Sequence, residues 1–520
     1  MASERPDRAR SLEALEKALD SDPDNLVALN IRLKYGLQEC DFAATEAVSD
    51  RLCRLMAKNL AQISDWRILA NFAYRALFIP VPTALLRRVT DRIDTLQRQS
   101  LDAIGRLPDL PPPDPAATRR RLRIGYMTPN FSDHPVGHVT LRLFPAHDRA
   151  RFEVHAFVTQ GRRGGDPAYN KRHRQGVDFY HDLGELPSFE IARRIRNLGI
   201  DILIDLDGYM ETASSAIMAF RPAPLQVYWL GHAGGLGLSF VDYLIADRLV
   251  VPPGEEGLYG ESILRLPECY HVASPAPVPE SSPSRVDCGL PETGFVFGAF
   301  NNTEKVDRRI FAAWMKILAA VPGSLLWLSA LRNIPGQIEG LRRQAAPHGI
   351  DPGRLVFAER LLHKADHFAR HRHIGLFLDT VTLNASTTAL DALWAGVPLL
   401  AVGGDCFANR ISNTMLTSIG IAEMITGDLD GYVGRAIHLA THPADLAAIA
   451  ARLRQNRDRM PLFDIARFAR HLEAGYEAIW ARYCQSEAPA TIDVPARLQL
   501  GCRGERGLAA GSQRSLACRR

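Results

Sequence analysis

The chain has 520 residues, 46% of them hydrophobic and 23% charged, which is the composition of a globular protein with room for about three domains. The formal net charge is +4, but residues 497–520 hold six arginines against one glutamate, so the rest of the chain is close to neutral. A general affinity for nucleic acid or anionic membranes is therefore not indicated. Eight cysteines without a Cys-x-x-Cys pair disfavour a zinc site and a disulfide framework. There is no apolar stretch after the charged N-terminus and no run of about 18 apolar residues, so we expect a cytoplasmic protein.

Residues 1–106 are predicted to be helical, because apolar residues recur at helical spacing and no strand pattern interrupts them. Residues 14–25 look like the last helix and proline turn of a tetratricopeptide repeat, but no second copy follows one period of about 34 residues later. A short repeat array and a plain helical extension both remain open. The proline-rich residues 107–118 cannot continue a helix and are predicted to form a stiff linker.

Two Rossmann-like α/β domains are predicted to follow, at 119–272 and 285–485. In both, short apolar runs alternate with helical stretches such as 188–197, which indicates parallel sheets covered by helices. A Pro and Ser cluster at 273–284 links the domains, and residues 486–520 are expected to be disordered. The expected strands are 122–127, 152–159, 200–206, 225–230 and 241–246, then 295–300, 325–329, 354–358, 375–380 and 398–402.

The loop after the strand at 295–300 is a candidate phosphate site. Lys305 lies about five residues past the end of that strand, where a doubly wound sheet meets its ligand, and its ammonium can neutralise a diphosphate. Asn301 and Asn302 beside it offer amides for hydrogen bonds. The alternative is a lysine that only caps or solvates the loop. We expect this loop to be exposed.

A second strand, loop and helix unit follows at 375–396. Ser386, Thr387 and Thr388 fall where N-cap and first-turn residues belong, and the free amides of such a turn suit phosphate oxygens. Asp391, about one turn into the helix, can accept hydrogen bonds from ribose hydroxyls. The alternatives are simple capping and an acid that favours the helix dipole.

Two further groups could contribute to such a crevice. His134 and His138 come directly after the first strand of the first domain, where a histidine can be a general base, a sugar-hydroxyl partner or merely packed. Lys364, His367 and Arg370 share one face of a helix, which fits either a clamp on a nucleotide base or a solvated basic face.

Asp205 and Asp207 form an Asp-x-Asp pair similar to one that binds a metal in some sugar transferases. Asp205 lies inside an expected strand, and acids at strand ends are common, so we favour a structural role for the pair. We predict no metal site.

Five motifs follow one another along residues 120–484. They are Arg-Ile-Gly-Tyr with Asp-His-Pro-Val-Gly-His (123–138), Phe-Arg-Pro-Ala-Pro-Leu-Gln-Val-Tyr-Trp-Leu-Gly (220–231), Val-Asp-Tyr-Leu-Ile-Ala-Asp (241–247), Phe-Asn-Asn-Thr-Glu-Lys-Val (300–306) and Leu-Trp-Ala-Gly-Val-Pro (393–398). In this order they resemble the protein O-GlcNAc transferase and Spindly family. The resemblance implies the two-Rossmann fold called GT-B behind a helical tetratricopeptide region. It also implies inverting, metal-independent transfer of a sugar from a nucleotide to Ser or Thr hydroxyls.

Carried over to this sequence, the resemblance makes His134 a histidine of the reaction centre and Lys305 the lysine that holds the diphosphate leaving group. Asn302 matches a neighbouring amide, Asp391 the ribose acid, and the helix at 364–370 the part that holds the base. The residues implied to bind the donor are Asn302, Lys364, His367, Arg370, Ser386, Thr387, Thr388 and Asp391.

The chain also departs from the family pattern. Ser386 stands where animal enzymes have a histidine that packs on the uridine diphosphate. Phe300-Asn301-Asn302 is similar to the Spindly branch, which uses GDP-fucose, whereas His134-Pro135 and His367 are similar to the GlcNAc branch. The short helical region and short link are similar to bacterial members.

We expect transfer of GlcNAc from UDP-GlcNAc to a protein or peptide hydroxyl, with no cofactor. The alternatives are a GDP-fucose-dependent protein O-fucosyltransferase, a sugar-nucleotide epimerase and a non-catalytic scaffold that binds sugar nucleotides.

Overall fold

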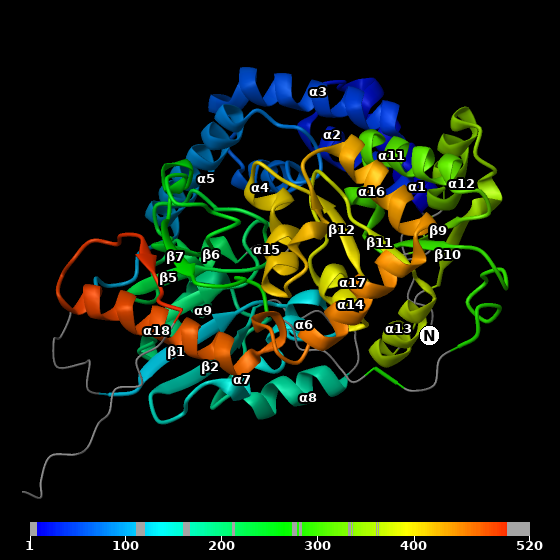
Figure 1. The fold of residues 1–520 in the computed structure, drawn as a ribbon. Coiled ribbons are helices and arrows are strands. Elements are labelled where there is room, and N and C mark those ends of the chain that lie inside the picture. The colour runs from blue at the N-terminus through cyan, green and yellow to red at the C-terminus, as the bar shows by residue number, and fades with distance from the viewer. Residues whose placement is uncertain are drawn as a thin grey trace, which may run out of the picture.

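The structure is a computed structural model with a helical arm and two α/β domains (Figure 1). The predicted linkers fall largely outside the residues that it describes. No helix of the described part is long and apolar enough to cross a membrane. The described residues are 8–110, 120–159, 167–210, 214–272, 278–279, 283–330, 334, 336–359, 361 and 363–496.

The arm confirms the helical prediction. Leu33, Leu52 and Leu69 are completely buried between its helices, and Asp41 caps one of them by accepting a hydrogen bond from the amide of Ala44. The arm helices are α1 (Arg8–Ser21), α2 (Leu26–Glu39), α3 (Phe42–Asn59), α4 (Trp66–Arg75) and α5 (Thr83–Ile104).

The arm docks on both α/β domains. On α5, Asp94 accepts a hydrogen bond from the amide of Ser239 at 2.9 Å, which ties the arm to the N-terminal domain. On α2, Gln38 donates to Glu304 of the C-terminal domain at 2.9 Å. Figure 1 shows the blue arm running across the top of both domains.

The N-terminal domain is an eight-stranded parallel sheet with the order β14-β7-β6-β5-β4-β1-β2-β3. Its strands are mostly continuous buried runs, as parallel sheets covered on both faces require. The strands are β1 (Leu122–Met127), β2 (Phe152–Val158), β3 (Phe179–Asp182), β4 (Ile202–Asp205), β5 (Leu225–Tyr228), β6 (Tyr243–Asp247), β7 (Ser262–Leu266) and β14 (Ile492–Asp493). The helices are α6 (Pro135–Thr140), α7 (Leu143–Ala146), α8 (Pro167–Gly176), α9 (Ser188–Asn197) and α10 (Ser215–Met218).

The C-terminal domain is a six-stranded parallel sheet with the order β10-β9-β8-β11-β12-β13. The strands are β8 (Val296–Ala299), β9 (Leu325–Ser329), β10 (Leu355–Ala358), β11 (Leu376–Leu378), β12 (Leu399–Val402) and β13 (Ile425–Thr426). The helices are α11 (Arg308–Ala320), α12 (Gln337–Ala345), α13 (Lys364–Arg370), α14 (Thr387–Trp394), α15 (Ile411–Ser418), α16 (Leu429–Thr441) and α17 (Pro443–Asn456).

In both sheets the strand order reverses beside the first strand of the domain. β1 lies between β4 and β2, and β8 lies between β9 and β11. Loops that leave the two strands at such a point diverge to opposite faces and open a crevice at the carboxyl edge. The loops after β8 and β11 carry Lys305 and Ser386, and the loop after β1 carries His134.

The last described segment returns to the N-terminal domain. The long helix α18 (Ile465–Cys484) packs there, with the hydroxyl of Tyr476 at 3.2 Å from that of Tyr126. After it, β14 pairs with β7. The predicted disorder is therefore wrong for residues 486–496, and the predicted domain end at 485 cuts through a segment that belongs with the first sheet. Residues 497–520 lie outside the described part.

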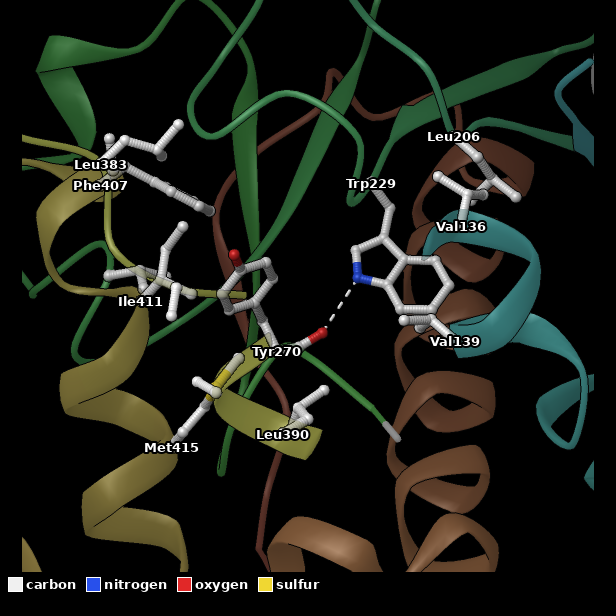
Figure 2. Packing of buried hydrophobic residues seen from close by; sticks show 14 of the residues in the cluster. Val136, Val139, Leu206, Trp229, Tyr270, Leu383, Leu390, Phe407, Ile411 and Met415 are labelled. Atoms are coloured by element: carbon white, nitrogen blue, oxygen red, sulfur yellow. Dashed lines mark hydrogen bonds between the residues drawn. The ribbon is translucent and has the colours of Figure 1, made fainter. Parts of the chain in front are cut away.

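Buried aromatic residues join the two domains. The indole nitrogen of Trp229 donates to the carbonyl oxygen of Tyr270 at 3.0 Å, and the ring centroid of Tyr270 lies 5.0 Å from that of Phe407 in the C-terminal domain. Figure 2 shows Val136 and Val139 of α6 on the Trp229 side, and Leu390, Ile411 and Met415 of the C-terminal domain on the Tyr270 side. This apolar contact fixes how α6 faces α14 and α15.

Candidate active site

The Lys305 loop is held by the arm. Glu304, which is 8% exposed, accepts from Gln38 at 2.9 Å and from Arg75 at 3.3 Å, so two arm helices grip the turn that precedes Lys305. Asn302 caps this turn by accepting from the amide of Glu304 at 3.3 Å. The expectation of an exposed loop is therefore wrong: the loop is clamped against the arm.

The Lys305 ammonium reaches toward the start of α14. Its Nζ donates to the carbonyl oxygen of Asn384 at 2.7 Å, two residues before the helix N-cap. Burial lowers the pKa of Lys305 to about 8, an effect that the nearby Asp379 opposes. A cation with few neutralising partners at a sheet's switch point is well placed to meet a diphosphate.

The N-terminus of α14 faces the same loop. Ser386 is its N-cap, yet the Ser386 side chain caps no amide of the helix. Thr388 donates to the side-chain oxygen of Asn301 at 2.6 Å, which joins the helix to the end of β8. Thr387 is partly exposed. The structure thus brings Lys305, Ser386 and Thr388 to one edge of the sheet, as the sequence predicts.

Asp391 lies one turn deeper and is paired with α13. Its carboxylate contacts Lys364 Nζ and lies 3.6 Å from His367 Nε2. Burial alone would raise the pKa of Asp391, but Lys364 and His367 outweigh burial and hold it below its usual range. Burial lowers the pKa of His367 to about 4, so this imidazole is neutral.

Arg370 does not point into the crevice, unlike Lys364 and His367 on the same side of α13. Its side chain is buried, with the guanidinium 4.8 Å above the ring of Phe300 and donating to the carbonyl oxygen of Glu359 at 2.6 Å. It also lies 2.8 Å from His367 Nδ1. This position supports His367 from behind and does not offer the guanidinium to the edge of a base.

His134 belongs to the opposite side, at the start of α6. Its Nδ1 accepts from the amide of Val136 at 3.3 Å, so it acts as the helix N-cap. His138, one turn later, lies 2.8 Å from Asp133. The imidazole of His134 is partly exposed and belongs to the N-terminal domain.

Asp205 and Asp207 are built into the N-terminal sheet. Asp205 accepts from the amides of Asp207 at 2.9 Å and Gly208 at 3.2 Å, and burial raises its pKa to about 6. Asp207 accepts from Asn130 at 3.0 Å. These bonds tie the end of β4 to the loop after β1. Within the described ranges, no group of three or more His, Cys, Asp or Glu side chains could hold a metal ion.

Sequence reasoning missed two features. His271, on the connection after β7, lies with its Nε2 2.8 Å from Ser386 Oγ. In addition, a cavity of about 1340 Å³ opens between the arm and both α/β domains. Arg309, at the start of α11, and Thr382, in the loop that also carries Ser386, line this cavity. Neither feature has a local sequence signature.

The family model of glycosyl transferase family 41 matches residues 39–279 and 275–472. The chain belongs to this family. It is 34% identical over 382 residues to an Arabidopsis thaliana protein named probable UDP-N-acetylglucosamine–peptide N-acetylglucosaminyltransferase SEC, covering 72% of this chain and 39% of that protein. A Petunia hybrida protein with the same enzyme name, SPINDLY, is 29% identical over 377 residues. The match covers 71% of this chain and 40% of that protein. The chain thus spans about two fifths of the length of these curated relatives.

One solved structure superposes on nearly the whole of this chain. The structure of a Thermobaculum terrenum O-GlcNAc transferase mutant superposes with a TM-score of 0.69 at 26% identity, covering 92% of this chain and 95% of that one. This match confirms the predicted GT-B fold with its helical N-terminal region.

Proposed function

We propose that this family 41 chain transfers GlcNAc from UDP-GlcNAc to Ser or Thr hydroxyls of a protein or peptide. The observation that carries the proposal is the convergence of Lys305 and the N-terminus of α14 at the reversal point of the C-terminal sheet. The relatives named for this reaction support the sugar and the nucleotide.

In the proposed reaction, the diphosphate leaves as the acceptor hydroxyl attacks the anomeric carbon. Lys305 and the first-turn amides of α14 stabilise the charge that develops on the leaving group, which is the largest expected catalytic contribution. Asn302, Thr387 and Thr388 would complete the phosphate contacts.

The nucleoside would lie along α13 and α14. Asp391 would exchange part of its contact with Lys364 for ribose hydroxyls, and the neutral His367 would pack against the base. Arg370 would hold His367 in place. No metal is required, because the charge of the diphosphate meets a lysine and helix amides.

The acceptor would enter through the large cavity. At about 1340 Å³ it has room for an extended peptide segment, and it reaches from the arm to Thr382, in the loop that carries Ser386. His134, on the N-terminal face, would orient the acceptor hydroxyl or accept its proton.

The test is transfer of label from UDP-GlcNAc, radiolabelled in the sugar, to proteins of a cell lysate. We expect protein-bound label that alkaline β-elimination releases, since the link is to a hydroxyl. Labelling only from GDP-fucose would move the assignment to the fucosyl alternative. Release of free sugar products without protein label would indicate an epimerase, and binding without turnover a scaffold.

Nucleotide choice provides an independent check. We expect UDP to bind at least about tenfold more tightly than GDP, a difference of about 1.4 kcal/mol. Calorimetric titration of both nucleotides measures this, and tighter binding of GDP would contradict the proposal.

A further inference from the structure

The connection between the domains places His271 beside the proposed diphosphate site. Tyr270, which precedes His271, has two contacts that hold it. Its carbonyl oxygen accepts a hydrogen bond from Trp229, and its ring lies edge-on to that of Phe407 with the ring centroids 5.0 Å apart (Figure 2). His271 itself is 2% exposed. A side chain on so rigid a backbone is directed at one place, which here is Ser386.

The hydrogen bonds of the imidazole define its tautomer. Nδ1 lies 3.2 Å from the carbonyl oxygen of Val272, which can only accept, so Nδ1 carries a hydrogen. Burial, with a contribution from Lys305, lowers the pKa of His271 to about 4, although the bond to Val272 opposes this. Nε2 is then an acceptor, and the Ser386 hydroxyl donates to it at 2.8 Å.

This pair explains why Ser386 caps no amide of α14. The Ser386 hydroxyl is engaged by His271, while the Ser386 carbonyl oxygen accepts from Ala389 and Leu390 inside the helix. Ser386 is therefore the N-cap of α14 with its hydroxyl bonded to His271. It lies two residues after Asn384, whose carbonyl oxygen Lys305 contacts.

We propose that His271 is a donor-positioning residue that acts through Ser386, as a two-member relay to the diphosphate. When a phosphate oxygen arrives, the Ser386 hydroxyl turns to donate to it. The Ser386 oxygen then accepts from Nε2–H of His271, which takes one proton from solvent and keeps its bond to Val272. The relay rests on the proposed function, because it assigns a partner within that same site.

The groups around the imidazole are compatible with this proton uptake. Lys305 faces it from the loop after β8, and Cys269 lies on its own connection, where the sulfur accepts the His271 amide at 3.4 Å. Burial raises the pKa of the Cys269 thiol, which stays neutral. The charge that a bound diphosphate brings to Lys305 and Ser386 favours the imidazolium.

The UDP affinities of His271→Asn and His271→Gln distinguish the relay from a role of His271 in packing alone. His271→Gln places an amide donor near the position of Nε2, and His271→Asn places one only near Nδ1. We expect His271→Asn and Ser386→Ala each to weaken UDP about tenfold, and His271→Gln to retain most of the affinity. The double variant His271→Asn with Ser386→Ala should be no weaker than either single one, because both remove the same contact.

Proton uptake is the readout that a purely structural role would not change. Titration of UDP-GlcNAc at pH 6.5, in two buffers of different ionisation enthalpy, should show uptake by the native chain that is lost in His271→Gln. Lys305 is already charged at this pH, since its pKa is about 8. His438→Asn, at an exposed histidine of α16, is the control and should change nothing.

Each outcome has a distinct meaning. Three results would overturn the relay. They are equal UDP affinity in the native chain and in Ser386→Ala, equal losses of UDP affinity in His271→Asn and His271→Gln, and the absence of proton uptake by the native chain. If His271→Asn unfolds, the affinities of Ser386→Ala, at a partly exposed residue, and of His271→Gln for UDP still decide the question. Failure of the native chain to bind UDP or UDP-GlcNAc would instead overturn the proposed function.

Discussion

Acidic side chains lie near the carboxyl edge of both sheets, but their partners differ in kind. In the N-terminal domain, Asp205 accepts from two backbone amides, and Asp247 accepts from the amides of Leu249 and Val250. In the C-terminal domain, Asp379 likewise accepts from the amides of Thr380 and Ala385, whereas Asp391 is held by the side chains of α13.

This difference separates structural acids from binding acids. Backbone amides of a folded loop cannot move away from their acceptor, so Asp205 and Asp247 are committed to the fold. A lysine side chain can swing aside, so the oxygens of Asp391 are available to ribose hydroxyls. Asp205 and Asp247 end their strands, whereas Asp391 lies one turn into α14, and the kind of partner follows from these positions.

The largest effect is expected at Lys305. Lys305→Ala should lower the turnover number by at least about a hundredfold, or about 3 kcal/mol in the barrier, because a single cation meets the leaving group. The melting temperature should be unchanged or slightly higher, since a partly desolvated ammonium is removed. Steady-state rates and thermal unfolding measure both quantities.

Lys316→Ala is the matched control for that experiment. Lys316 is an exposed lysine of α11 and lies in the same domain. It should retain full activity. A near-normal rate in Lys305→Ala would remove Lys305 from the mechanism and, with it, the contrast between the two sheets.

The next effect is expected at Asp391. Asp391→Asn keeps the shape of the side chain but loses the charge that orders Lys364, so we expect UDP to bind about tenfold more weakly. Calorimetry with UDP and a melting curve test this. A large loss of stability with unchanged affinity would place Asp391 among the structural acids.

Asp205→Asn is the converse substitution. One of the two amide bonds to the side chain must be lost, because the Asn nitrogen cannot accept, and an unpaired buried group costs about 1–3 kcal/mol. We expect lower stability in denaturant unfolding and unchanged UDP affinity of the folded protein. Unchanged stability with lost activity would return Asp205 to the site.

Most strands with continuous burial could be predicted, but β7 (Ser262–Leu266) is buried and is missing from the predicted set. The bounds 122–127 and 325–329 are confirmed by β1 and β9, because parallel strands read as unbroken apolar runs. β3 was missed because Phe179–Asp182 lies at the sheet edge and is largely exposed. The return of α18 to the first domain was missed because an amphipathic pattern does not say which sheet a helix covers.

The site could be predicted where a residue follows directly from a strand or a helix start. Lys305, Ser386 and Asp391 have such positions. His271 has none, because it lies in irregular chain and its partner is 115 residues away. The burial of Arg370 could not be foreseen either, since helical spacing places it on the same face as His367 without showing that this part of the face is covered.

The pH dependence of donor binding tests the charge of Lys305. Its pKa in the donor-free protein is lowered to about 8, so the ammonium form is present below pH 8 and is lost as the pH rises above it. Affinity for UDP should be nearly constant below pH 7, fall to about half by pH 8 and fall by up to about tenfold by pH 9. The Lys305→Ala variant should show no such fall, whereas a fall in both proteins would assign the titration to another group.

Removal of divalent cations should have the smallest effect of all. The leaving group is met by Lys305 and by the amides of α14, and Asp205 and Asp207, the acids most similar to a metal-binding pair, accept from amides and from Asn130. Transfer rates in excess EDTA should therefore equal those in buffer alone. Activity that returned only with Mn²⁺ or Mg²⁺ would show that these acids release their present partners to hold a metal, and the division between structural and binding acids would no longer hold.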